Sequence, residues 1–187
     1  IMSVTNVDGS DLSHTINRTM MRINLTKPLA SGETFSFKIA WWYNINNHRT
    51  QGGRSGYEHF PADGNNNYVI AQFYPRMCVY DNVEGWQNDQ FWGRSEFALE
   101  FGDFKVNITT PADHMLGATG VLLNEKEVLS KTEQKRLATA RKTFDKPVLI
   151  RTQKEAEKIE KKRAKKTKTW KFHAKNVRDY AFATSRK

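Results

Sequence analysis

The sequence predicts a mainly β domain, an antiparallel β-sandwich that carries an inserted helical pair. Two patterns support this prediction. Apolar residues alternate with polar ones in several short segments of residues 1–124, and the apolar spacing changes to that of a helix after residue 124. Turn-forming residues separate the alternating segments, as in antiparallel sheets with one buried face. The chain of 187 residues is long enough to bury a core.

Four alternating segments are expected to be strands. They are residues 21–25, 35–45, 97–101 and 104–108. In the longest of them, six apolar residues share one parity and are expected to face the core: Phe35, Phe37, Ile39, Trp41, Tyr43 and Ile45. Gly102 and Asp103 lie between the last two segments, where we expect a turn or a bulge.

The segment 46–67 is expected to be a long loop without regular structure. It contains four glycines, five asparagines and one proline, and these residues favour turns over strands and helices. Loops of this length inside compact domains are usually functional or mobile.

Two capping-box patterns predict two helices after residue 124. The first is Ser-Lys-Thr-Glu at 130–133, and the second is Thr-Gln-Lys-Glu at 152–155. Apolar residues at helical spacing extend the first helix to Phe144, shortly before Pro147. Because strand alternation resumes at residues 169–174, we interpret the helices as an insertion within one β domain that covers the whole chain.

The positive charge is concentrated in and around the insertion, residues 125–167. The net charge is +10, but residues 1–124 hold 9 Lys or Arg and 12 Asp or Glu, whereas residues 125–187 hold 21 and 8. The segment 151–168 contains nine basic and three acidic residues, and such a segment can contact phosphates. It lacks interleaved aromatic residues, and its glutamates are spaced as on a mixed helix surface. The pattern favours a solvated helix over a nucleic-acid partner.

The sequence contains no recognisable catalytic or metal-binding motif. HExxH, a nucleophile elbow, a phosphate-binding glycine loop and a dinucleotide fingerprint are all missing. His59 follows Glu58, but a surface histidine is favoured over a metal ligand at this position. Cys78 is the only cysteine, which excludes an internal disulfide and a cysteine-based zinc site. No apolar run is long enough for a membrane span, and no signal-peptide pattern is present.

The segment 81–96 leaves a ligand-binding role open. Trp86 and Trp92 flank a loop in it, and exposed tryptophans on a β-sandwich often bind sugar rings. A stand-alone carbohydrate-binding module is therefore one alternative function. The acidic residues of the same segment are closely spaced, but they favour solvated turn positions over a pair of catalytic carboxylates.

Several motifs carry a resemblance to a known family. They are YPRMCVYDNVEGW at 74–86, GRSEF at 93–97, FGDFKVNITTP at 101–111, ATGVL at 118–122 and VRDYAFATS at 177–185. These stretches, within residues 68–124 and 168–187, resemble the N-terminal domain of gluzincin zinc metallopeptidases of the aminopeptidase N type, particularly their bacterial branch.

The resemblance implies a saddle-like β domain that precedes a thermolysin-like catalytic domain. In the family that second domain carries GxMEN and HExxH, so we expect it, with its zinc, to follow residue 187. The segment described by this sequence should hold no cofactor or metal and should be inactive alone. Its implied partners are the catalytic domain and the peptide substrate. The implied location is the periplasm of a Gram-negative bacterium, after export.

The resemblance also implies two substrate-binding residues. The family's N-terminal domain presents a Gln or Glu to the free amine of the substrate, and the matching stretch here is AQFYP at 71–75. Gln72 falls on the family's first Gln, and Tyr74 takes the position of the recognising Gln or Glu. A tyrosine hydroxyl can accept a hydrogen bond from an ammonium group but lacks a carboxylate charge, which weakens the implied preference for a free N-terminus. The alternative is that both are ordinary strand residues.

Overall fold

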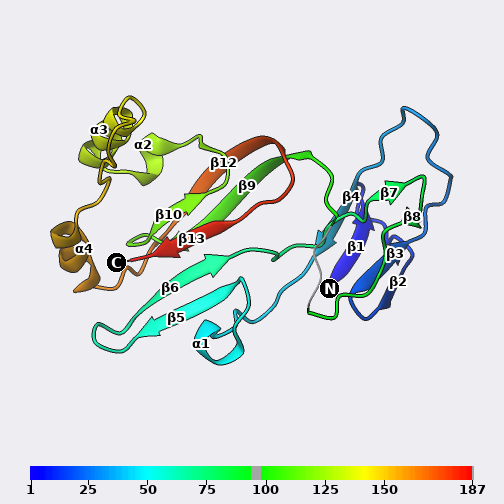
Figure 1. Cartoon of the computed structure of the whole chain (residues 1–187), viewed down its shortest axis with the longest axis horizontal. Helices are drawn as coiled ribbons and strands as arrows, with labels where there is room; N and C mark the ends of the chain where they lie inside the picture. Colours follow the sequence, from blue (N-terminus) through cyan, green and yellow to red (C-terminus); the bar gives the residue numbers. More distant parts are fainter. Residues whose placement is uncertain (94–97, 187) are drawn as a thin grey trace. The chain divides into compact units, whose positions relative to one another are not determined.

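The structure is a computed structural model that describes residues 1–93 and 98–186. It is mainly β, with several small antiparallel sheets and a few short helices, so the predicted fold class is confirmed at this level (Figure 1). The chain divides into two compact units. Unit 1 comprises Ile1–Asn44 and Arg76–Leu99, and unit 2 comprises Ile45–Pro75 and Glu100–Lys187.

Unit 1 consists of three two-stranded antiparallel pairs. They are β1 (Ser3–Asn6) with β4 (Phe37–Ala40), β2 (His14–Asn17) with β3 (Met20–Ile23), and β7 (Tyr80–Asp81) with β8 (Gly85–Trp86). Among its described residues, the only buried apolar side chains are Val4 and Leu12. Unit 1 therefore has almost no core of its own.

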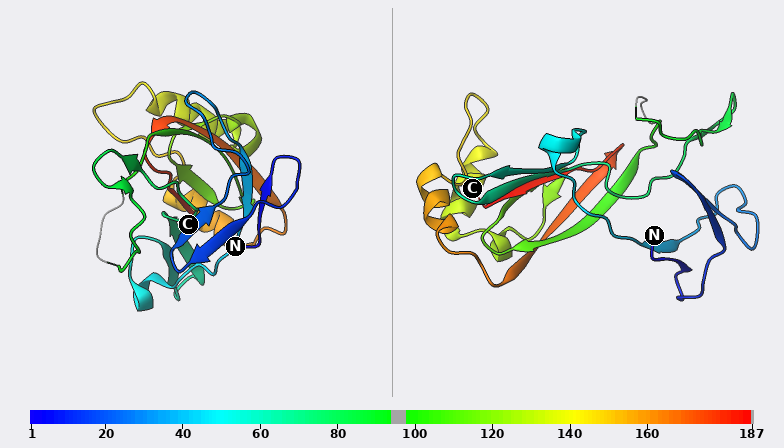
Figure 2. Two further views of the ribbon diagram at one scale, coloured as in Figure 1. Left: turned by 90° about the vertical axis from the view of Figure 1, so that its right-hand side faces the viewer. Right: turned by 90° about the horizontal axis from the view of Figure 1, so that it is seen from below.

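Unit 2 contains two larger antiparallel sheets (Figures 1 and 2). The first has the order β10 (Met115–Ala118), β13 (Phe182–Ser185), β6 (Asn65–Ile70), β5 (Gly56–Phe60). The second has the order β11 (Val121–Leu122), β12 (Thr167–Val177), β9 (Gly102–Pro111). The predicted strands at 104–108 and 169–174 are confirmed as the centres of β9 and β12, which pair in register from Pro111 opposite Thr167.

The core of the molecule lies in unit 2. Trp170 and Tyr180 are each 1% exposed, and Phe172 and Ala174 share the buried face of β12 with Trp170. Alternate residues of a strand point to the same face, so one face of β12 supplies much of this cluster. Ile108 contributes from β9 to the same cluster.

Three helices, and not the predicted two, lie between β11 and β12 among the described residues. They are α2 (Glu125–Val128), α3 (Lys131–Ala140) and α4 (Gln153–Glu160). Both predicted capping boxes are confirmed at α3 and α4. The short α2 has no side-chain cap, because Asn124 bonds the backbone of Thr169 and Lys171 in β12 and the Glu127 side chain, but no backbone N–H of the helix.

The first inserted helix is shorter than predicted. It ends at Ala140, and Phe144 lies outside it. The proline at 147 disfavours a helical conformation at Lys146, and Phe144 has no apolar neighbour that would reward another turn. Across the described ranges, no helix combines the length and the apolar character needed to cross a bilayer.

The predicted strand at 35–45 is mostly wrong. Only Phe37–Ala40 forms a strand, and Trp41 and Tyr43 are 38% and 44% exposed in place of facing a core. The paired stretch of β4 ends at Ala40, which lies opposite Ser3, the first residue of β1. Among the described residues, no strand pairs with the alternating residues after Ala40.

The prediction of an irregular loop at 46–67 is also wrong. The segment contains α1 (His48–Gln51), all of β5 and the beginning of β6. Its turn-forming residues lie at both ends of α1, where Asn47 is the N-cap and Gly52 the C-cap, and in the β5–β6 hairpin loop at 61–64. The three asparagines at 65–67 pair with β5, and Asn66 also bonds His59 and Tyr68 through its side chain.

The prediction for the region around Gly102 is confirmed in part. Phe97 lies outside the described residues, and residues 98–101 form no strand. A bulge does occur opposite Asp103, but the extra residue belongs to β12, between Ala174 and Val177. Asn176 has a φ of +51° there, and its N–H donates to Asp103 Oδ1 at 2.8 Å.

Candidate functional site

A groove of about 620 Å³ lies in unit 2 between β6 and β13 on one side and the end of β9 on the other. Ile70, Ile108 and Phe182 supply apolar lining. Polar lining includes two histidines and two arginines, and no described carboxylate lines the groove. A neutral-to-cationic lining with apolar patches suits a ligand that carries a negative group or an extended peptide.

His114 is the buried titratable group of this groove. Its Nδ1 lies 3.2 Å from Thr184 Oγ1, and the Thr184 hydroxyl donates its proton to Met115 O at 2.8 Å. Nδ1 must therefore carry the hydrogen, which leaves Nε2 as an acceptor. Burial lowers the pKa of His114 and outweighs the opposing effect of Asp113, so the ring is neutral at pH 7.

A buried ion pair involves Arg186, which lines the groove. Arg186 Nη2 lies 2.9 Å from Asp113 Oδ2, with the two side chains 11% and 4% exposed. The same oxygen accepts the backbone N–H of Ala164 at 2.9 Å. Burial opposes ionisation of Asp113, but the bonds from Ala164 and Arg186 prevail, so its pKa lies below the usual value. The positive charge of Arg186 is thus balanced within the protein.

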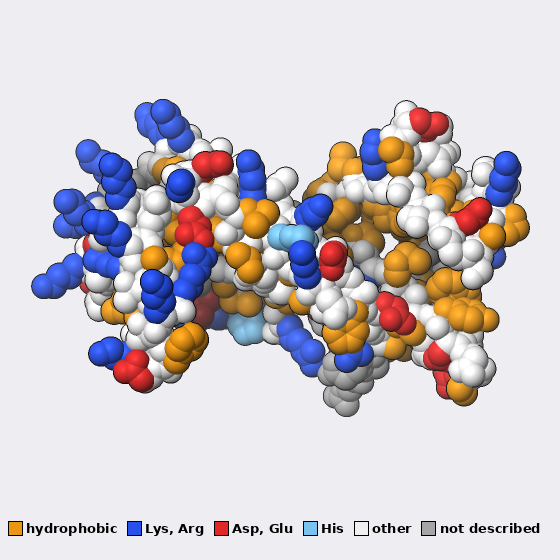
Figure 3. Space-filling model, turned by 90° about the horizontal axis from the view of Figure 1, so that it is seen from above, with side chains coloured by type: hydrophobic (Ala, Val, Ile, Leu, Met, Phe, Trp, Pro, Cys, Tyr) orange, Lys and Arg blue, Asp and Glu red, His pale blue; other side chains and the backbone are white. Residues whose placement is uncertain are grey.

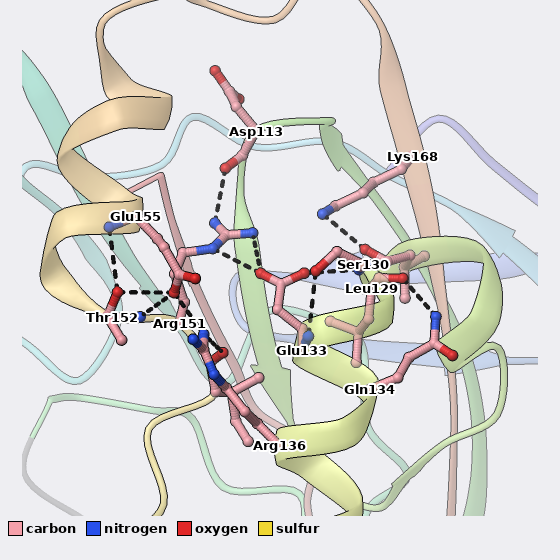
Figure 4. Close-up of polar contacts among 12 residues, drawn as sticks. Asp113, Leu129, Ser130, Glu133, Gln134, Arg136, Arg151, Thr152, Glu155 and Lys168 are labelled. Carbon is pink, nitrogen blue, oxygen red and sulfur yellow. Dashed lines mark hydrogen bonds and ion pairs between the residues drawn. The ribbon is translucent and has the colours of Figure 1, made fainter.

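Two further ion pairs connect the inserted helices reciprocally (Figure 4). The capping glutamate of α3, Glu133, pairs with Arg151, which precedes α4, at 2.9 Å. The capping glutamate of α4, Glu155, pairs with Arg136 of α3 at 2.6 Å. The hydrogen bond from Arg136 is the main reason why the pKa of Glu155 falls to about 2. The first turn of α3 is therefore bonded to the residue before the α4 cap, and the first turn of α4 is bonded to α3.

Lys168 is a partly buried cation next to this network. Its Nζ donates to Val128 O at 3.2 Å and lies 4.5 Å from the centre of the Trp170 ring. Burial, with a smaller contribution from Arg151, lowers the pKa of Lys168 to about 8. Lys168 is therefore an internal residue and does not belong to a continuous basic surface.

The two predicted substrate-binding residues follow β6 and lie in no strand. Gln72 is exposed and has a φ of +53°. Tyr74 is half-buried, and its hydroxyl donates to Asp179 Oδ1 at 2.7 Å. The alternative of ordinary strand residues is wrong for both, while a substrate-binding role stays a prediction.

Of the other predicted positions, His59 lines the groove and Cys78 does not. His59 is exposed on β5, and its Nδ1 lies 2.7 Å from Asn66 Oδ1. Cys78 is half-buried in unit 1, with Sγ 3.9 Å from Met20 Sδ. In the part of the chain that the structure describes, no group of three or more His, Cys, Asp or Glu is arranged to hold a metal.

Trp86 and Trp92 are both exposed, by 55% and 72%. Each already has one neighbour, because Trp86 packs edge-to-face on Tyr80 at 5.3 Å and the Arg18 guanidinium lies 5.3 Å from the centre of the Trp92 ring.

Sequence reasoning missed the acid–histidine pair that the fold buries. It singled out Glu58 and His59, whereas Asp113 and His114 are equally adjacent and follow the end of β9. Both are buried, and His114 lines the groove. Comparison with known proteins adds no assignment: no family model, no curated protein and no solved structure matches the chain.

Proposed function

We propose that the chain is the non-catalytic N-terminal domain of a zinc-dependent metallopeptidase of aminopeptidase type. In this role it packs on a catalytic domain, in an exported enzyme, and walls the peptide cleft near the N-terminus of the substrate. The zinc and the reacting groups belong to the catalytic domain. A saddle-like sandwich is the finer architecture that goes with this proposal.

The pairing of the motif-bearing segments is the observation that carries the proposal. The two resembling regions, residues 68–124 and 168–187, are separated by the insertion, yet β9 and β10 of the first region pair with β12 and β13 of the second. The resemblance therefore follows one connected set of strands, and the basic insertion branches out between them. Chance similarity in two distant segments would have no reason to fall on strands that pair.

The same strands position the expected amine-recognition segment. Phe182 of β13 pairs with Ile70, the last residue of β6. Phe73 then packs edge-to-face on Phe182 at 5.4 Å. Residues 71–75 are thus held against the motif at 177–185, and Ile70 and Phe182 both line the groove.

Asp179 compensates for the charge that Tyr74 lacks. Because the Tyr74 hydroxyl donates to Asp179 at 2.7 Å, its lone pairs remain oriented to accept from an ammonium group, and the carboxylate provides negative charge behind it. Tyr74 and Asp179 together can replace the Gln or Glu that the family presents to the substrate amine.

The first test concerns the chain by itself. The 187-residue protein is expected to hydrolyse no aminoacyl p-nitroanilide and to retain less than stoichiometric zinc after dialysis. Tightly bound stoichiometric zinc, or metal-dependent peptidase activity, would overturn the proposal. Reading the coding sequence beyond Lys187 is an independent test, because the proposal requires an HExxH motif there.

The second test concerns amine recognition in the full-length enzyme. Tyr74→Phe and Asp179→Asn are each expected to lower kcat/KM for substrates with a free N-terminus by about tenfold, the value of roughly one charge-assisted hydrogen bond. N-acetylated peptides should be cleaved equally by all variants. Tyr57→Phe is the matched control in the same unit. Equal losses for free and acetylated substrates would show that the pair is only structural.

Carbohydrate binding through Trp86 and Trp92 is the second candidate, because both side chains are exposed. It predicts glycan binding that Trp92→Ala abolishes. A glycan array without a binder would remove this candidate.

A further inference from the structure

The loop between α3 and α4, residues 141–150, projects from unit 2 as the yellow-to-orange segment of Figures 1 and 2. It exposes large apolar side chains: Phe144 is 93% exposed and Leu149 is 67% exposed. Moving an apolar side chain out of water is favourable, so two exposed apolar residues in one short loop offer a surface that a partner could cover.

The loop and the helices on either side of it carry exposed lysines. Lys142 and Lys146 lie in the loop with one acid, Asp145, next to Phe144, and the helices add Lys131, Lys135 and Lys154. Figure 3 shows the Lys and Arg side chains of unit 2 gathered at the end that carries the helices. The loop therefore combines an apolar tip with a cationic surround.

The cations differ in whether they are paired. The arginines of this region are engaged internally, because Arg136, Arg141 and Arg151 pair with Glu155, Glu125 and Glu133 respectively. None of the five lysines just named has an acidic partner among the described residues. Their charge remains available to an external anion.

We propose that the loop at 141–150 docks the protein onto a bilayer surface that contains anionic phospholipids. Phe144 and Leu149 enter the interfacial region, and the lysines contact the lipid phosphates. Apolar insertion combined with electrostatic attraction to anionic lipid is the usual basis of peripheral membrane binding. The proposal is independent of the proposed peptidase role.

The chemistry of the tip favours a bilayer over a nucleic acid. Bases are bound by stacking on aromatic rings, and of the two exposed apolar residues only Phe144 has a ring. Leu149 contributes nothing to stacking but has a favourable place among acyl chains. The reciprocal ion pairs of Glu133 and Glu155 hold both ends of the loop, so docking requires no unfolding of α3 or α4.

Co-sedimentation with vesicles tests the proposal. The 187-residue chain is expected to bind vesicles of phosphatidylcholine with a quarter phosphatidylglycerol, to bind pure phosphatidylcholine vesicles at least about tenfold more weakly, and to lose affinity as salt rises. Phe144→Ser and the double change Lys142→Gln with Lys146→Gln should each weaken binding by about tenfold. Val69→Ser and Lys105→Gln, which change exposed residues of β6 and β9, are the matched controls.

A fluorescent label reports the depth of the tip. In a Cys78→Ser background, an NBD group on Phe144→Cys should shift to the blue on anionic vesicles, whereas the same label on Val69→Cys should not. Three results would overturn the proposal: no binding to anionic vesicles at low salt, binding that Phe144→Ser leaves unchanged, or no spectral shift on bound protein. Tight oligonucleotide binding that depends on the lysines and not on Phe144 would assign the surface to nucleic acid instead.

Discussion

Replacing Glu133 by Gln is expected to destabilise unit 2 by about 3 kcal/mol. The Glu133 and Arg151 side chains are only 11% and 10% exposed, and they meet at 2.9 Å. Glutamine keeps an oxygen that can accept the Ser130 N–H, so most of the cap survives. Arg151 is then left as a buried charge without a counter-ion. Breaking one partner of a buried pair costs about 3–5 kcal/mol, and we take the lower limit because Arg151 also donates to Asp113 O.

Glu155→Gln is the matched control for this change. Glu155 has the same capping role and also pairs with an arginine, but it and Arg136 are 42% and 28% exposed. Solvent screens such a pair, so its loss should cost far less. The comparison therefore isolates the effect of burial, because both glutamates are the N3 residue of a capping box, both are replaced by glutamine and both pair with an arginine.

Urea unfolding and amide hydrogen exchange across residues 131–140 measure the two losses. Exchange is needed because two compact units need not unfold as one. Replacing both Glu133 and Arg151 by Met should cost less than Glu133→Gln, because no charge remains buried. If Glu133→Gln and Glu155→Gln cost the same, burial does not set the strength of the pair and the reasoning is refuted.

The sign of the pH dependence provides a second check on Glu133. Burial raises the pKa of Glu133, but the bonds from Ser130 and Arg151 outweigh burial, so the folded-state pKa lies below the reference value of 4.5. The stabilisation is complete above the unfolded-state pKa and is lost as the pH falls through the folded-state pKa. Glu133→Gln should abolish this contribution to acid unfolding.

Three other substitutions have distinct signatures. Because the pKa of Lys168 is lowered to about 8 from 10.5, the stability of the wild-type protein should rise with pH between these values. Lys168→Met should lack this rise. If the pH profile of the variant equals that of the wild type, the buried position of Lys168 is contradicted. Burial lowers the pKa of His114 below 6.5, so on acidification the unfolded chain takes up a proton at this histidine before the folded chain does, and stability falls. His114→Gln should reduce this dependence of the melting temperature on pH. Gly120→Ala should cost about 3 kcal/mol, because Gly120 has a φ of +90° and an added Cβ would lie 2.5 Å from His173 O. Gly117→Ala, where the added Cβ meets open space, is the neutral control. Equal melting temperatures of the two variants would refute the predicted clash.

Local signals in the sequence were sufficient where one short segment contains the whole interaction. Both capping boxes formed as predicted, because the side chain and the N–H that it bonds are three residues apart. The alternation at 104–108 and 169–174 also predicted strands correctly, because these segments have long partners in register along their whole length. Alternation predicts a strand reliably when the strand is paired and one of its faces is buried.

The same periodicity failed where the partner was missing. Residues 41–45 alternate as well as residues 104–108 do, but within the described part of the chain no strand pairs with them, and Trp41 and Tyr43 remain exposed. Asparagines and glycines at 46–67 predicted a loop, yet side-chain hydrogen bonds within the β5–β6 hairpin accommodate the asparagines in strands. Composition reflects the conformational preference of each residue type, but it does not show which groups will surround a residue in the fold.

The sequence by itself determined the mainly β class, the capping boxes that start α3 and α4, and the motifs that suggest a metallopeptidase domain. Only the tertiary structure decided which polar groups meet. It brought Asp113 to Arg186, Glu133 to Arg151 and Tyr74 to Asp179, and it left Phe144 in solvent. The reason is physical: capping and alternation depend on neighbours along the chain, whereas burial and ion pairing depend on residues that only folding brings together.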